Sequence, residues 1–172
     1  MSWFGIEKLF GSSGKFPEPA ESELLVLVDD DAGNDVILRY RVTFAAYSYY
    51  TDDNGAWICF QAQANELIEP ADRGKWPNGQ PHLRVRIPAS EEDFLQMEKG
   101  VASTFETTAY DSAKDVWLAE FYHFSHGGLS ATFKLIEKRE NGLVFRIKGE
   151  SEVTGPIRLR AFFEKKPSLS YH

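Results

Sequence analysis

One carboxylate and three histidines carry most of the chemistry that this sequence could support. Glu120 lies in segment 116–124, whose other residues are apolar or aromatic apart from His123. A strand that is apolar on both faces is expected to be central, so Glu120 should be substantially buried and hydrogen-bonded or ion-paired, with Arg158 or Arg160 as candidate partners. The pattern favours this structural role. The alternative is a ligand-binding carboxylate or general base, acting with His123 in a small hydrolytic site.

The histidines also raise the question of a metal. His123 and His126 stand three residues apart at the expected end of a strand, before a Gly-Gly pair, and His82 or Glu120 would complete a three-ligand site if the fold brought them together. The acidic loop 29–35 lacks the spacing of a calcium-binding loop. We therefore expect no tightly held metal and no cofactor. Cys59 is the only cysteine, so no intramolecular disulfide can form.

A candidate recognition surface combines tyrosines and amides with a long loop. Tyr47 and Tyr49 alternate along one strand segment, and Gln61 and Gln63 along the next, so the pairing proposed below places all four on one face. Side chains of these types suit recognition because they offer rigid contact area and hydrogen bonds. Loop 69–82 follows directly, is rich in proline and glycine, and contributes the remaining candidates, which are Arg73, Trp76 and His82. An ordinary solvated sheet face, with Trp76 folded over the sheet edge, is the alternative.

Two Asn-Gly turns position these residues, one at Asp53-Asn54-Gly55 and one at Glu140-Asn141-Gly142. Alternating segments flank each turn, as in an antiparallel hairpin. A two-residue Asn54-Gly55 loop would place the apolar sets of the two strands on opposite faces. A three-residue loop instead pairs Phe44 with Ala64, puts Phe44 and Ile58 on one face, and in the second hairpin pairs Leu135 with Ile147. We therefore predict three-residue loops with positive φ at Gly55 and Gly142.

The remaining elements complete a mainly β chain. Ser90 is expected to cap a short helix, with Asp93 reaching back to it, and residues 2–10 are expected to form an amphipathic helix. Segments near 116–124, 129–138, 143–150 and 157–164 predict an antiparallel meander. The fold class is therefore an antiparallel β-sandwich or a partly closed β-barrel with two short helices. We expect residues 1–19 to form the helix and a linker, 20–166 a single β-rich domain, and 167–172 a tail.

Charge and composition restrict the function classes. The net charge of −7 disfavours binding to nucleic acid or to an anionic membrane, because both require a concentrated basic face. No apolar run has the length of a transmembrane helix and no signal-peptide pattern is evident, so a cytoplasmic location is expected. The leading hypothesis is a non-enzymatic protein that binds another protein, of the inhibitor or immunity type. The alternative is a β-barrel that binds a small ligand or carbohydrate, with hydrolysis at Glu120 and His123.

Overall fold

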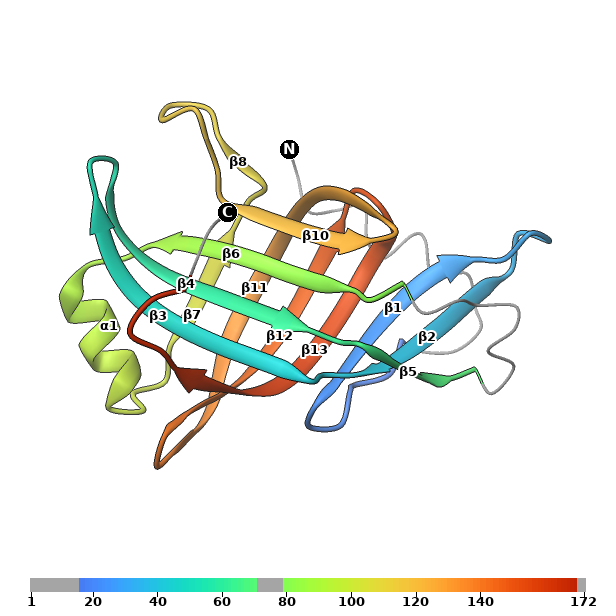
Figure 1. Ribbon diagram of the computed structural model, residues 1–172, viewed down its shortest axis with the longest axis horizontal. Coiled ribbons are helices and arrows are strands. Elements are labelled where there is room, and N and C mark those ends of the chain that lie inside the picture. The colour runs from blue at the N-terminus through green and yellow to red at the C-terminus, as the bar shows by residue number, and fades with distance from the viewer. Residues whose placement is uncertain (1–15, 71–78, 170–172) are drawn as a thin grey trace.

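The computed structural model describes residues 16–70 and 79–169, and these form a mainly β structure built around a barrel (Figure 1). The mainly β fold class is thereby confirmed, in its barrel form. The helix expected over residues 2–10 lies outside the described residues. Seven strands make the barrel wall, namely β3 (Phe44–Asp52), β4 (Gly55–Gln63), β6 (His82–Pro88), β10 (Ala119–His123), β11 (Ser125–Arg139), β12 (Gly142–Ser151) and β13 (Gly155–Lys165).

Antiparallel pairing builds most of the barrel, and one short parallel contact closes it. Strands β10 to β13 are consecutive antiparallel neighbours, as the predicted meander requires. Strand β6 joins β10 to β4, and β4 pairs with β3. The circle closes where Ala46 and Tyr47 of β3 lie beside Glu164 and Lys165 of β13 in parallel orientation. In Figure 1, β3, β4, β6 and β10 pass in front of β11, β12 and β13.

The other strands extend or decorate this wall. Three of them continue the sheet outward from the first half of β13, in the order β1, β2, β5. A fourth pairs with the second half of β11, and two form a separate hairpin that projects from the barrel. Their bounds are β1 (Glu23–Asp29), β2 (Asp35–Arg41), β5 (Glu66–Glu69), β7 (Thr104–Thr107), β8 (Tyr110–Asp111) and β9 (Val116–Trp117).

Helix α1 (Glu91–Glu98) begins with the predicted capping box. The Ser90 hydroxyl accepts the Asp93 amide proton, and the Asp93 carboxylate accepts the Ser90 amide proton, which satisfies two otherwise free donors. Phe94 and Met97 are the buried residues of the helix. They join the barrel core, where Phe94 packs against Tyr47 and Tyr49 from β3.

Aromatic side chains fill the barrel interior. Phe60 lies at the centre, with ring centroids 4.8 Å from Phe133, 5.0 Å from Phe145 and 5.6 Å from Phe163. All four residues are fully buried. Edge-on and tilted ring contacts of this kind add to the free energy gained by burying the apolar area.

A second, smaller cluster lies on the outside of β3 and β4. Trp57 and Cys59 point outward there and pack with Leu118, and Leu169 of the C-terminal segment is packed against them. The Trp57 ring also lies between the Lys114 ammonium, at 5.0 Å, and the Arg86 guanidinium, at 5.2 Å. Both faces of β4 are therefore covered near Trp57.

The register predicted for the first hairpin is wrong. Tyr49 pairs with Ile58 and Phe44 with Gln63, so Phe44 and Ile58 lie on opposite faces and the loop contains only Asp53 and Asn54. The cause is a strand change at residues 42–43, where the chain passes from pairing with β1 to pairing with β4. Even-numbered residues face the core in β2 and odd-numbered residues do so in β3, although the sequence alternates without interruption.

The second hairpin has the predicted faces but another register. Leu135 pairs with Phe145, not Ile147, and a bulge at Ile136 leaves Glu140 and Asn141 as the loop. Gly55 has the predicted positive φ, at 136°, but Gly142 does not have one. Gly142 is required for another reason, since a Cβ atom there would lie 2.2 Å from the carbonyl oxygen of Phe163.

Over the described parts of the chain, no helix has both the length and the apolar character needed to span a bilayer.

Candidate functional site

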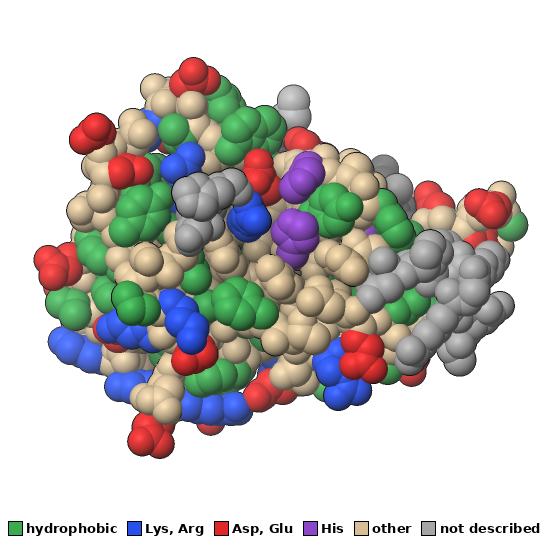
Figure 2. Space-filling model, in the orientation of Figure 1, with side chains coloured by type: hydrophobic (Ala, Val, Ile, Leu, Met, Phe, Trp, Pro, Cys, Tyr) green, Lys and Arg blue, Asp and Glu red, His purple; other side chains and the backbone are tan. Residues whose placement is uncertain are grey.

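Four neighbouring strands bring polar and aromatic side chains together on the outside of the barrel. Cross-strand pairing places Gln63, His82, Tyr122 and His126 in one row. The next row contains Gln61, Arg84 and Glu120. We call these seven residues the polar–aromatic face, and all of them are partly or fully accessible to solvent. Figure 2 shows histidine, acidic, basic and hydrophobic side chains gathered on this side of the barrel.

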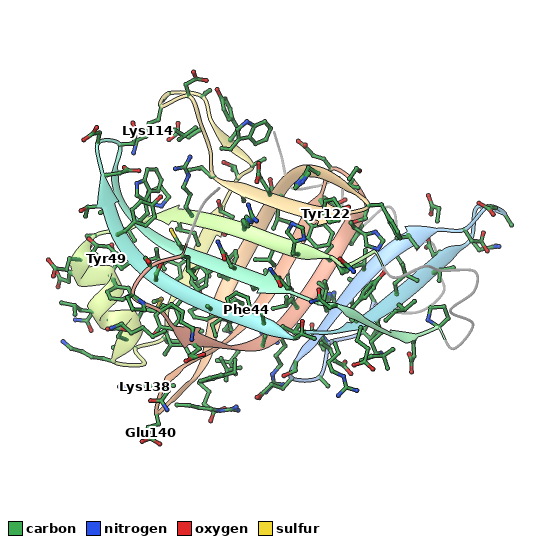
Figure 3. All side chains as sticks on the ribbon, in the orientation of Figure 1. Phe44, Tyr49, Lys114, Tyr122, Lys138 and Glu140 are labelled. Atoms are coloured by element: carbon green, nitrogen blue, oxygen red, sulfur yellow. The ribbon has the colours of Figure 1, made fainter. Side chains whose placement is uncertain are left out.

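Three rings form the centre of the polar–aromatic face. The His82 ring stacks on Tyr122 with centroids 4.8 Å apart, and the His126 ring lies 4.9 Å from Tyr122 at a steeper angle. The two imidazoles are 6.0 Å apart. Each ring therefore contacts the other two. Tyr122, which is labelled in Figure 3, lies between the two histidines in the cross-strand row. A rigid aromatic group of this kind loses little conformational entropy when it binds a partner.

The surroundings of His82 favour its neutral form. Partial burial lowers the pKa of His82, and the positive charge of Arg84 and the nearby His126 lower it further, while the Gln80 carbonyl and Glu120 act in the opposite direction. Nδ1 of His82 lies 3.3 Å from the Gln80 carbonyl oxygen. A carbonyl oxygen can only accept a hydrogen bond, so the neutral ring carries its hydrogen on Nδ1. Nε2 is then left as a hydrogen-bond acceptor.

The β8–β9 hairpin adds two exposed aromatic rings beside this face. Trp117 is 53% exposed and Tyr110 is 38% exposed, and their centroids are 5.3 Å apart. Arg86 ties the hairpin to the barrel by donating from Nε to the Trp117 carbonyl oxygen at 2.7 Å. Large aromatic side chains that stay exposed on a well-anchored element are typical of contact surfaces.

His123 follows Tyr122 in β10 and points to the opposite side of that strand, into the interior of the fold. Its Nε2 is 2.8 Å from the Tyr40 hydroxyl, and both residues are buried. The Gly79 amide also donates to the Tyr40 oxygen, and the phenol can donate its own proton to Nε2 when the imidazole carries its hydrogen on Nδ1. Burial lowers the pKa of His123 to about 4 and raises that of Tyr40 to about 12. This is a neutral, hydrogen-bonded pair.

Glu120 and His123 are therefore not brought together. They project from opposite faces of β10, which alternates between half-buried and buried residues. Glu120 is half-buried, less than the sequence predicts, and its cross-strand neighbour is Arg84 instead of Arg158 or Arg160. The expected central strand is interrupted at Leu118, and its outer face is open. A hydrolytic site made of Glu120 and His123 has no geometric basis.

The predicted tyrosine and amide surface is divided between two faces. Tyr47 and Tyr49 point into the barrel, where the Tyr47 hydroxyl donates to the Glu98 carboxylate at 3.1 Å and Tyr49 stacks on Phe94 at 4.9 Å. Gln61 and Gln63 point outward, because the hairpin register differs by one residue from the predicted one. Arg73 and Trp76 lie outside the described residues.

Four of the predicted residues belong to the polar–aromatic face: Gln61, Gln63 and His82 from the predicted recognition surface, and Glu120 from the predicted carboxylate site. Sequence reasoning missed Tyr122, His126 and Arg84 as parts of it. The alternation of Glu120 and Tyr122 in segment 119–123 was the available signal, because it places both on one face of a strand.

A groove of about 590 Å³ lies elsewhere, between α1, the β11–β12 turn and the end of β13. Tyr47 and Glu98 line it, and Lys165 forms an ion pair with Glu98 at 2.6 Å. More than half of its other lining residues are charged, and the full set is Lys138, Arg139, Glu140, Asn141, Gly142, Leu143, Glu164, Lys166 and Pro167. Burial and the neighbouring Glu98 carboxylate raise the pKa of Tyr47.

The comparisons with other proteins assign no family. In the described ranges, no group of three or more His, Cys, Asp or Glu side chains is arranged to hold a metal ion. No protein-family model matches the sequence, and no curated protein or solved structure matches it significantly.

Proposed function

We propose that this chain is a binding protein that recognises another protein through the polar–aromatic face. The observation that carries the proposal is the row of Gln63, His82, Tyr122 and His126 across four strands, with its three rings in mutual contact. The row presents amide, imidazole and phenol groups where a merely solvated sheet would present mostly lysine, glutamate and threonine. Tyrosine and arginine are enriched at the centres of protein interfaces.

The barrel interior supports a surface role. Barrels that hold a small ligand keep space inside the wall, whereas here Phe60, Phe133, Phe145 and Phe163 occupy the centre in mutual contact. Recognition is therefore assigned to the outside. Tyr110 and Trp117 would extend the contact area beyond the seven residues of the face.

The partner is proposed to present a basic surface. The chain carries a net charge of −7, which accelerates encounter with a positively charged protein. An inhibitor or immunity-type protein acting in the cytoplasm on a basic partner fits this charge and the small size of the chain. The chain has a single cysteine, the buried Cys59, and so forms no intramolecular disulfide, which is compatible with a reducing compartment.

Photo-crosslinking tests this proposal directly. A photoreactive amino acid is placed at position 126 on the polar–aromatic face and, in a matched variant, at position 51 near the β3–β4 turn, outside that face. Both are exposed positions on strands, so expression and stability should be similar. We expect one discrete crosslinked protein from position 126 in lysate of the source cells. Equal crosslinking from both positions, or none from position 126, would contradict the proposal.

The groove beside Glu98 favours a second candidate function, the binding of a small ligand. It has the volume of a small-molecule site, and the Glu98 carboxylate in it is held by Tyr47 and Lys165. Screening by thermal shift with the wild-type chain and with Lys138→Ala, which removes one lining side chain of the groove, would test it. A compound that stabilises the wild type and not the variant would support the groove as a site.

A further inference from the structure

A concentrated cationic surface lies on the outer side of β11, β12 and β13, although the chain as a whole is acidic. Lys134, Arg146 and Arg160 are direct cross-strand neighbours in one row, and Lys148 and Arg158 are neighbours in the next. We call these five residues the cationic patch. Net charge alone conceals it, because acidic residues elsewhere outnumber the basic ones.

The five positive charges of the cationic patch repel one another unless a negative charge lies among them. Like charges directly opposite each other on neighbouring strands destabilise a sheet, and the cationic patch contains three such pairs. Glu23, the cross-strand neighbour of Arg160, is already paired with Arg39. Glu21 and Glu137 interact with Arg160 but are themselves paired with Arg139. Repulsion around Lys148 and Arg158 therefore requires a counter-charge from another segment.

The N-terminal segment supplies this counter-charge. We call residues 16–22, which precede β1, the strap. The Glu18 carboxylate of the strap is 2.8 Å from Lys148, 3.3 Å from Arg158 and 3.8 Å from Arg146, so one carboxylate serves three cations. These cations lower the pKa of Glu18. The Phe16 ring is buried under the Arg158 guanidinium at 4.7 Å, and Arg158 also donates to the Phe16 and Pro17 carbonyl oxygens.

The first half of the strap is held by burial as well as by charge. Phe16 and Pro19 are buried, whereas about half of the Glu18 side chain is exposed. Ion pairs at this exposure contribute little free energy and are screened by salt. The second half is held by two contacts between Glu21 and Arg139 and by the Ser22 amide, which donates to the Arg160 carbonyl. Residues 16–20 are not part of a strand, so exchange of the segment around Glu18 requires Phe16 to leave its site but does not require any strand to unpair.

We infer that the cationic patch is a docking site for an extended acidic peptide segment of a partner protein, and that Phe16 to Glu18 of the strap occupy it in competition. This inference concerns the opposite side of the barrel from the polar–aromatic face and does not depend on the proposed function. The contacts of the strap indicate which groups such a peptide should carry. It should place an aromatic side chain under Arg158 and, two residues later, a carboxylate between Lys148, Arg158 and Arg146. A peptide is favoured over a nucleic acid because the ring and backbone carbonyls are recognised as well as the charge, and because the remainder of the chain repels polyanions.

The test uses the full chain and a fluorescent peptide with the sequence of residues 14–22. In the wild type the strap competes at an effective concentration on the order of millimolar, which weakens binding of an added peptide. Glu18→Lys should release the patch and tighten peptide binding by about tenfold in fluorescence anisotropy. Asp31→Lys is the control, because it makes the same charge change at an exposed turn residue far from the patch.

Further measurements make the result decisive. Adding Arg158→Ala to Glu18→Lys should weaken peptide binding at least about tenfold, and so should replacing Glu18 of the peptide by alanine. Glu18→Ala serves as a milder variant if Glu18→Lys fails to fold by circular dichroism. Equal peptide affinity in the wild type, Glu18→Lys and Glu18→Ala would overturn the inference. A nine-nucleotide single-stranded DNA that binds Glu18→Lys as tightly as the peptide would also overturn it, because it would show a surface for any polyanion.

Discussion

The buried His123–Tyr40 pair makes a specific prediction about acid stability. Within residues 16–70 and 79–169, the hydrogen-bond and ring contacts of His123 are with Tyr40, Phe121 and Phe124, and none of these side chains is charged. Burial disfavours the imidazolium, so the folded state holds the pKa at about 4, below the ordinary value of 6.5. As the pH falls, the unfolded chain takes up this proton first, and the folded chain loses stability.

The size of the effect follows from the two pKa values. A difference of about 2.5 units, at 1.36 kcal/mol per unit, limits the loss to about 3 kcal/mol. At pH 5 the unfolded histidine is almost fully protonated and the folded one about one-tenth protonated, which gives a loss of about 2 kcal/mol relative to pH 8. The stabilisation is complete above about pH 6.5 and is lost as the pH falls toward 4.

Urea denaturation of the wild type and His123→Gln at pH 8 and pH 5 measures this loss. Glutamine keeps an acceptor for the Tyr40 hydroxyl and does not titrate, so the free-energy difference between wild type and variant should change by about 2 kcal/mol between the two pH values. Titration of carboxylates is common to both proteins and cancels. If the difference between wild type and His123→Gln is the same at both pH values, the reasoning about burial is refuted.

Three other predictions concern packing, a hydrogen bond and metals. Gly142→Ala should destabilise the fold by roughly 2–4 kcal/mol in urea denaturation, because its Cβ would meet the Phe163 carbonyl, whereas Gly33→Ala, with positive φ but open space, should cost about 1 kcal/mol. Equal costs would argue against the close approach. Tyr47→Phe should cost about 1–2 kcal/mol by removing a hydrogen bond to the Glu98 carboxylate, and an unchanged urea midpoint would show that this bond contributes nothing. Dialysis against a chelator should leave the melting temperature unchanged, and a clear decrease would reveal a structural metal.

The fold class was predictable because local signals agreed with it. Alternating segments, the Asn-Gly turns and the Ser90–Asp93 capping box each specify an element from neighbouring residues alone. The register was not predictable, because it depended on where β2 ends and β3 begins. Hydrogen bonds from Val42 to Ser22 and from Thr43 to Gln63 determine that point, and both partners are distant in sequence.

The candidate site was only partly predictable for the same reason. The one-residue change in register turned Tyr47 and Tyr49 into core residues and left Gln61 and Gln63 outside. Tyr122 and His126 could not be joined to His82 from the sequence, since only the pairing of β6, β10 and β11 brings the three together. The cationic patch was hidden by the net charge for a similar reason, because strand pairing gathers its members.

The affinity of the crosslinked partner for variants of the polar–aromatic face is the most direct test of the proposed function. Tyr122→Ala and His126→Ala are titrated with the purified partner by calorimetry, beside Thr51→Ala near the β3–β4 turn as the control. We expect at least about a tenfold increase in Kd for each variant of the face, with melting temperatures showing that both remain folded, and no change for the control. Unchanged Kd for Tyr122→Ala and His126→Ala would contradict the assignment of recognition to this face.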